Sequence, residues 1–144
     1  MARIICAILI LFIGVILQLL IGEFFGFWIS FVLAALIASA FFLNLFEFLI
    51  STLLAVFMLN WQPAFSYEMT FFAALPFAVY FLRDALPYER WLSNLLFIFA
   101  AVLFMYLLFG PGIIVAATPI FIGELLAVAL FGIFALKALE AVPA

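Results

Sequence analysis

Residues 27–60 read FWISFVLAALIASAFFLNLFEFLISTLLAVFMLN, an apolar stretch that is too long to cross a bilayer once. As one helix rising 1.5 Å per residue it would extend about 50 Å, whereas the hydrocarbon core of a bilayer is about 30 Å thick. A single span would also place Asn44 and Glu47 near the bilayer centre, where polar groups are least tolerated. The sequence therefore predicts a hairpin that turns near Asn44, with two short helices at about 27–43 and 45–60.

The composition of the whole chain is typical of a membrane protein. Of the 144 residues, 74% are hydrophobic and 8% are charged, and the mean hydropathy is +1.62. So few charged side chains cannot cover the surface of a water-soluble domain, so the apolar surface must face lipid. The 22 Phe residues suit such an environment because their rings pack without a polar atom that needs a partner. We therefore expect an all-α, polytopic membrane bundle that forms one domain over 1–144.

Turn signals divide the rest of the chain into further apolar helices. Gly and Glu residues at 22–26 break the first one, and the segment 83–90, with four of the eleven charged residues, is the clearest loop. Thr118 followed by Pro119 is typical of a helix start. The apolar residues 113–117 either dip into the membrane or add a turn to the last helix. The prediction is six short transmembrane helices, at about 3–21, 27–43, 45–60, 67–82, 91–109 and 118–139.

The four cationic residues favour this number of crossings. With six crossings and a cytoplasmic N-terminus, Arg3, Arg83, Arg90 and Lys137 all lie on the cytoplasmic side. If the hairpin were one span, Arg83 and Arg90 would lie on the side opposite Arg3. The positive-inside rule therefore predicts six crossings with both termini in the cytoplasm.

Glu124 is the polar residue that most needs an explanation. It lies some six residues inside the last helix, about 9 Å below its start. An ionised carboxylate at that depth is costly, so we expect it to be protonated, paired or facing water. Gln18 lies at a similar depth, and Asn60 and Glu68 lie nearby on the same side of the membrane. These four residues suggest an outward-opening polar pocket that binds a ligand, couples to protons or contacts a partner's helix; the alternative is one interhelical hydrogen bond that fixes packing.

A second polar group is expected at the cytoplasmic side. Glu47 lies one turn into the third helix, on the same side as Arg83 and Arg90. One interpretation is a structural ion pair between Glu47 and one of these arginines, and the other is a role in binding a partner. The 83–90 segment is either a solvated turn or the place where a soluble partner would dock.

No residue pattern indicates an enzyme, a metal centre or a nucleic-acid interface. His is absent and Cys6 is the only cysteine, which excludes an intrachain disulfide, a thiolate or imidazole zinc site and a His-based triad. The cationic residues are isolated from one another, so no basic patch for nucleic acid exists. We expect no cofactor and no metal, and we expect the partners to be the lipid bilayer and other membrane proteins.

The residues at 46–60 also suggest a family. Phe46-Glu47-Phe48-Leu49-Ile50 begins an apolar helix that ends in Phe57-Met58-Leu59-Asn60, and a short Pro-containing loop and another apolar helix follow. In this arrangement the chain over about 45–110 resembles the family of the rod-shape-determining membrane protein MreD. The resemblance implies a non-enzymatic subunit of the cell-elongation machinery in the bacterial inner membrane, which determines cell shape. It also implies a six-helix fold similar to that of vitamin-binding transporter subunits.

Two functions remain open at this point. The first is a scaffold subunit of a larger membrane complex, supported by the missing catalytic residues and by the near absence of soluble mass. The second is a small transporter or substrate-binding membrane subunit with its polar pocket around Glu124. An outward cavity lined by Gln18, Asn60 and Glu124 would favour transport, and a filled bundle would favour scaffolding. An intramembrane enzyme would need a second polar side chain within hydrogen-bonding distance of Glu124 in a cleft.

Overall fold

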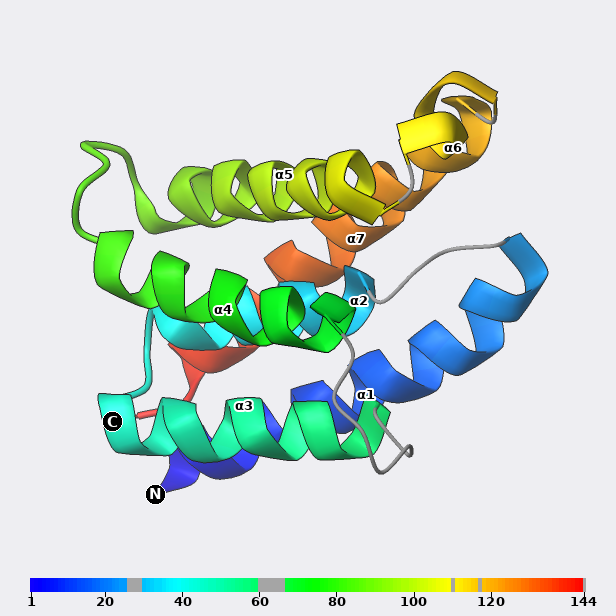
Figure 1. Cartoon of the computed structure of the whole chain (residues 1–144). Coiled ribbons are helices and arrows are strands. Elements are labelled where there is room, and N and C mark those ends of the chain that lie inside the picture. The colour runs from blue at the N-terminus through cyan, green and yellow to red at the C-terminus, as the bar shows by residue number, and fades with distance from the viewer. Residues whose placement is uncertain (26–29, 60–66, 110, 117, 144) are drawn as a thin grey trace.

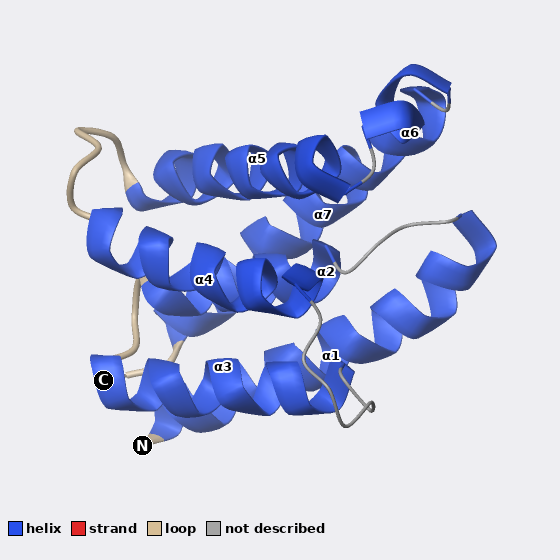
Figure 2. Ribbon diagram, viewed as in Figure 1, coloured by secondary structure: helices blue, strands red, loops and turns tan. Residues whose placement is uncertain are grey.

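The computed structural model describes residues 1–25, 30–59, 67–109, 111–116 and 118–143. Within these residues the chain is all-helical and contains no strand (Figure 2). Short loops join the helices, which lie side by side in a bundle (Figure 1). The helices are α1 (Ala2–Phe25), α2 (Ser30–Ala40), α3 (Leu45–Leu59), α4 (Tyr67–Leu82), α5 (Arg90–Phe109), α6 (Pro111–Ala116) and α7 (Thr118–Ala141).

Helix α2 is the centre of the bundle. Every residue from Phe31 to Ala40 is buried, and the helix packs against α1, α3, α4, α5 and α7. Its alanines allow close approach of the neighbouring helices because they add little side-chain volume. Its one polar side chain in this stretch, Ser39, donates a hydrogen bond to the carbonyl of Ala35 at 2.8 Å, so it adds no unsatisfied donor. The central helix is therefore apolar on all sides.

The long apolar stretch 27–60 forms two helices, with the break where the polar residues lie. Helix α2 ends at Ala40 and α3 begins at Leu45. Asn44 caps α3: its Oδ1 accepts from the Glu47 amide at 2.9 Å, and Glu47 Oε2 accepts from the Asn44 amide at 3.4 Å. This reciprocal pair satisfies two of the amides that a helix start leaves without intrahelical partners. The polar residues that a single span would bury thus start the second helix of the hairpin.

Two helix boundaries differ from the expectation. Helix α1 continues through Gly22 and Glu23 to Phe25, so the predicted break at 22–26 is wrong for its first four residues. A helix tolerates an isolated glycine at a cost of about 1 kcal/mol, which the apolar residues around it can outweigh. Residues 111–116 form the short helix α6, which is separate from α7, so these residues do not add a turn to α7. The Thr118 hydroxyl donates back to the carbonyl of Ile114 in α6 at 2.7 Å.

Helix length separates the helices into two groups. Three segments are long and apolar enough to cross a membrane, namely Ala2–Leu20, Arg90–Leu108 and Thr118–Ala141. Three other apolar helical segments of the described chain are shorter, namely Phe31–Ala40, Leu45–Leu59 and Thr70–Leu82. They extend about 15–23 Å, less than the thickness of a typical hydrocarbon core. The fold is an all-α bundle of apolar helices compatible with a membrane.

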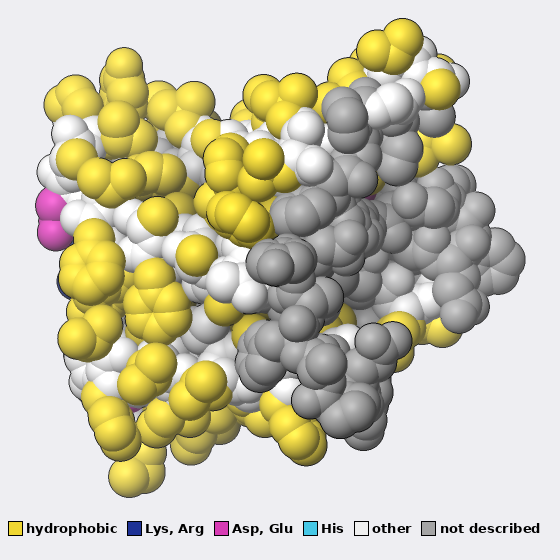
Figure 3. Space-filling model, in the orientation of Figure 1, with side chains coloured by type: hydrophobic (Ala, Val, Ile, Leu, Met, Phe, Trp, Pro, Cys, Tyr) yellow, Lys and Arg dark blue, Asp and Glu magenta, His cyan; other side chains and the backbone are white. Residues whose placement is uncertain are grey.

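Both the core and the outer surface of the bundle are apolar. Three large apolar side chains, each on a different helix, expose 70% or more of their surface, namely Phe46 on α3, Phe81 on α4 and Leu130 on α7. Figure 3 shows hydrophobic side chains over most of the described part of one face, with few charged groups. Apolar area on this scale promotes aggregation in water, whereas it is well solvated by lipid tails.

The two termini lie at one end of the bundle (Figure 1). Arg3 and Arg90 there both contact Phe42, and Arg83 contacts the nearby Ala40 carbonyl. Arg3 Nε donates to the carbonyl of Val142 at 3.1 Å, which joins the start of α1 to the end of α7. Arg83 follows α4, Arg90 begins α5 and Lys137 lies in the last turns of α7. We call this part of the molecule, defined by Arg3, Arg83, Arg90 and Lys137, the cationic end.

Candidate functional site

Glu124 is fully buried, and its carboxyl group is held by Tyr106. The Tyr106 hydroxyl, from the last turns of α5, donates a hydrogen bond to Glu124 Oε2 on α7. Phe121, one turn before Glu124, packs edge-on against the Tyr106 ring with the centroids 5.0 Å apart. The side chain of Glu124 therefore faces the interior and contacts Tyr106, a partner that the sequence did not predict. The expected contact with Asn60 lies outside the described residues.

Gln18 connects α1 to the central helix. Its side chain is buried, and Oε1 accepts a hydrogen bond from the Phe31 amide at 3.2 Å. Phe31 lies in the first turn of α2, where backbone amides have no intrahelical acceptor. Gln18 thus supplies an acceptor from a different helix, and it stabilises the buried start of α2.

The other two residues of the predicted outward pocket lie beyond what the structure describes. Asn60 is outside the described residues, and Glu68 lies in α4 with its side chain outside the description. The polar groups that the structure does place there, Gln18 and Glu124, each bind a group of a neighbouring helix. Those two contacts are interhelical links of the kind that fixes packing.

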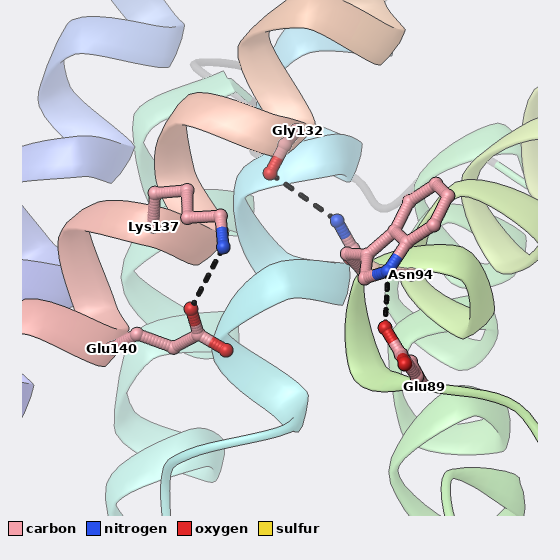
Figure 4. Close-up of polar contacts among 6 residues, drawn as sticks. Glu89, Asn94, Gly132, Lys137 and Glu140 are labelled. Atoms are coloured by element: carbon pink, nitrogen blue, oxygen red, sulfur yellow. Dashed lines mark hydrogen bonds and ion pairs between the residues drawn. The ribbon is translucent and has the colours of Figure 1, made fainter.

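Asn94 forms a third interhelical link, which the sequence analysis missed. It is fully buried in α5, and its Nδ2 donates to the carbonyl of Gly132 on α7 at 3.2 Å (Figure 4). Gly132 permits this approach, because a Cβ atom on it would overlap Cδ1 of Ile98 on α5. Among the described residues Asn94 Oδ1 has no hydrogen-bond partner, and neither does the buried hydroxyl of Ser51. The sequence feature that could have indicated this contact is the Asn94 side-chain amide, which lies one turn after Arg90 inside an apolar helix.

At the cationic end, Glu47 and Arg83 both bind backbone rather than each other. Glu47 completes the cap of α3 with Asn44, and the described residues include no ion pair between Glu47 and Arg83 or Arg90. Arg83 Nη1 donates to the carbonyl of Ala40 at 2.6 Å and more weakly to that of Leu43 at 3.4 Å. These are carbonyls at the end of α2, where a helix leaves acceptors unpaired. Glu47 and Arg83 therefore stabilise the two sides of the α2–α3 turn.

Phe42 in this turn lies between two cations. The guanidinium carbons of Arg3 and Arg90 lie 5.4 Å and 5.2 Å from the centroid of its ring. Both distances are within the range of a cation–π contact. The start of α1 and the start of α5 thus meet at the turn between α2 and α3.

The cavities that described residues line include three whose lining does not contain Glu124. A mostly polar one of about 270 Å³ lies at the cationic end beside the α4–α5 loop. An apolar one of about 260 Å³ lies between α4 and α5. A third, of about 320 Å³, lies between α1 and α3 and is lined by Phe12, Val15, Leu19, Met58 and Leu59.

The described interior contains polar side chains that donate and accept hydrogen bonds between helices. No group of three or more His, Cys, Asp or Glu side chains in the described chain is placed to hold a metal ion. Tyr106 does supply a second polar side chain within hydrogen-bonding distance of Glu124. Both side chains of that pair are almost completely buried.

Comparison of the chain with protein families, with curated proteins and with solved structures gives no match.

Proposed function

We propose that this chain is a non-enzymatic integral membrane subunit that acts as a scaffold in a larger membrane complex. The observation that supports this most is the burial of Glu124 against Tyr106. The polar side chain best suited to bind a substrate is used to join two helices. Asn94 and Gln18 make similar links, so the described polar interior holds the bundle together.

The surface available to partners follows from the same arrangement. The outer helix faces are apolar, and the described loops are short. A complex would therefore form through the lipid-facing sides of the helices and through the cationic end. Small transmembrane interfaces of this kind depend on close packing of helix faces, because lipid is as apolar as the helices themselves.

We further propose six crossings, with both termini in the cytoplasm of a bacterial inner membrane. The gathering of Arg3, Arg83, Arg90 and Lys137 at one end supports this orientation under the positive-inside rule. The short helices α2, α3 and α4 would cross where the bilayer thins around the protein. The resemblance of about 45–110 to the MreD family supports a place in the cell-elongation machinery.

The experiment is co-purification at native expression level. A tagged chain is extracted in a mild detergent, and the recovered proteins are identified by mass spectrometry. A tagged polytopic membrane protein of similar size and unrelated sequence is the control for nonspecific recovery. We expect one or more membrane proteins in near-stoichiometric amount with this chain and absent from the control, together with altered cell shape when the chain is depleted.

The competing function is a small transporter or substrate-binding membrane subunit that uses Glu124. It requires a state in which the Tyr106–Glu124 contact opens to water. Recovery of the chain alone, together with solute uptake into proteoliposomes that Glu124→Ala abolishes, would establish transport and overturn the scaffold proposal.

A further inference from the structure

The polar cavity at the cationic end is lined by two arginines, one that follows α4 and one that begins α5. It is lined by Phe41, Arg83, Asp84, Leu86, Tyr88, Arg90 and Ser93. Arg83 is held in place by the carbonyls of Ala40 and Leu43 through Nη1, and its guanidinium lies 4.5 Å from the centroid of the Tyr80 ring. Nη1 of Arg83 is thereby occupied, and the other N–H groups of its guanidinium can still donate to a ligand.

The charge of this cavity favours an anion. Arg83 and Arg90 contribute two positive charges, and the first turn of α5 adds the positive end of a 20-residue helix. Asp84 is the only acid in the lining, and its oxygen lies 3.8 Å from Arg83 Nε with its side chain 95% exposed. An ion pair this exposed contributes little, so it competes weakly with a ligand. Nearby Glu89 accepts from the Trp91 indole at 2.6 Å.

An apolar groove lies between α4 and α5. Val79 and Ala101, which are buried, form its floor. Ala78 and Ala100 leave the space open, because their side chains are too small to fill it. The remaining lining residues are Leu75, Leu82, Phe97 and Phe104.

The polar cavity and the groove adjoin each other. Leu82 of the groove directly precedes Arg83 of the cavity, and Phe97 of the groove lies one helical turn after Ser93 of the cavity. The ring of Phe41, in the cavity lining, packs against that of Phe97 with the centroids 6.2 Å apart. A molecule with an anionic head and an apolar tail would therefore find both surfaces along one line.

We propose that this combined site binds one anionic phospholipid. Arg83 and Arg90 hold the headgroup phosphate, and one acyl chain lies in the groove between α4 and α5. Basic pockets beside apolar helix grooves are how membrane proteins recognise anionic headgroups. Trp91, exposed at the start of α5, sits beside the cavity as expected for a residue at headgroup level. The site is independent of the scaffold proposal and requires only that the chain is embedded in lipid.

Two other occupants fit only part of the site. A free phosphate compound would use the arginines and leave the groove without a role. A transmembrane helix of a partner would fill the groove and leave the arginines without a role. The phospholipid uses both, and variants of each half distinguish the three.

The test is native mass spectrometry of the purified full chain titrated with phosphatidylglycerol, or with diacylglycerol of the same acyl chains. Arg90→Gln removes one guanidinium, and Ala100→Phe fills the groove at an exposed position. Each change is expected to weaken phosphatidylglycerol binding about tenfold, the size expected for one charge-assisted hydrogen bond or for a blocked acyl site. Wild-type protein should bind diacylglycerol much more weakly, because it lacks the phosphate.

Matched variants control for charge and for bulk. Lys137→Gln removes a cation at the same end but outside the cavity, and Ala74→Phe adds the same ring to an exposed position of α4 outside the groove. Both should bind the lipid like wild type. The proposal would be overturned if Lys137→Gln and Arg90→Gln weakened lipid binding equally, or if Ala100→Phe left lipid binding unchanged. It would also be overturned if inorganic phosphate displaced the lipid at comparable concentration. Loss of a co-purifying membrane protein in Ala100→Phe, with lipid binding unchanged, would assign the groove to a partner helix instead.

Discussion

The hydroxyl of Tyr106 donates a hydrogen bond to the carboxyl group of Glu124, and this contact joins α5 to α7 inside the bundle. Both side chains are almost completely buried, so water does not compete for either group. A polar group in an apolar interior is costly unless it has a partner. The hydrogen bond therefore makes the packing of α7 against α5 specific, because another rotation of α7 would separate the pair.

Replacing Tyr106 by Phe is expected to lower the free energy of unfolding by about 1–3 kcal/mol, because the buried carboxyl group loses this donor while the ring volume is kept. Glu124→Gln should cost less, because the amide oxygen accepts from the same hydroxyl. Glu124→Leu should cost more than Glu124→Gln, because it removes the acceptor. Unfolding in mixed micelles by added SDS, followed by circular dichroism, measures all three.

A double-mutant cycle separates this contact from general loss of packing. If the two groups act through one hydrogen bond, Tyr106→Phe combined with Glu124→Leu should cost less than the sum of the single changes, by 0.5 kcal/mol or more. Strictly additive costs would show that the contact does not stabilise the bundle.

A side chain at Gly132 is expected to displace the end of the Ile98 side chain. Gly132→Ala should destabilise the fold by about 1 kcal/mol or less, because only the terminal Cδ1 of the buried Ile98 must move and alanine has the higher helix propensity. Ile98→Val removes that one carbon, so the double variant should regain most of the loss. The SDS unfolding midpoint measures the effect.

Gly112 provides the matched control, since an added Cβ there meets nothing within 4 Å. Gly112→Ala should leave stability unchanged or raise it slightly, because alanine has the higher helix propensity. Failure of Ile98→Val to rescue Gly132→Ala would mean that the glycine is needed for a reason other than this contact.

The length of the apolar stretch 27–60 was enough to predict its break near Asn44, because bilayer thickness limits a span whatever the packing. The position of Glu124 along its helix likewise indicated that it needed a partner. Neither argument gave the partner itself. Depth follows from counting residues, whereas the direction of a side chain around the helix axis depends on how the helices pack.

Gln18 and Glu124 show this limit directly. They were grouped because they lie at similar depth, yet the contacts that the structure describes link Gln18 to α2 and Glu124 to α5. Small residues spaced four apart in α2, Ala34/Ala38 and Ala35/Ser39, did indicate an interior helix, and every residue from Phe31 to Ala40 is buried. The close approach at Gly132 needs the distance between α5 and α7, which one sequence does not contain.

Asn44→Ala is expected to destabilise the hairpin by about 0.5–2 kcal/mol, because the Glu47 amide loses its acceptor at the start of α3. Asn44→Ser is the control, since a serine hydroxyl accepts from the same amide and should restore most of the stability. Hydrogen exchange localises the effect, with faster exchange expected in the first turn of α3. Equal stability of the Ala and Ser variants would contradict a capping role.

The proposed topology predicts where two loops lie relative to the membrane. Reporter fusions at Gln62 and at Asp84 should report opposite sides, with Asp84 in the cytoplasm, because α4 separates the two positions and the cationic end faces inward. Alkaline phosphatase, active only outside, and a cytoplasm-dependent fluorescent protein give complementary signals at each position. A further fusion after Ala141 should match Asp84. If both fusions report the same side of the membrane, α4 does not cross. If Gln62 is cytoplasmic and Asp84 is external, the orientation is the inverse of the one that the four cationic residues favour.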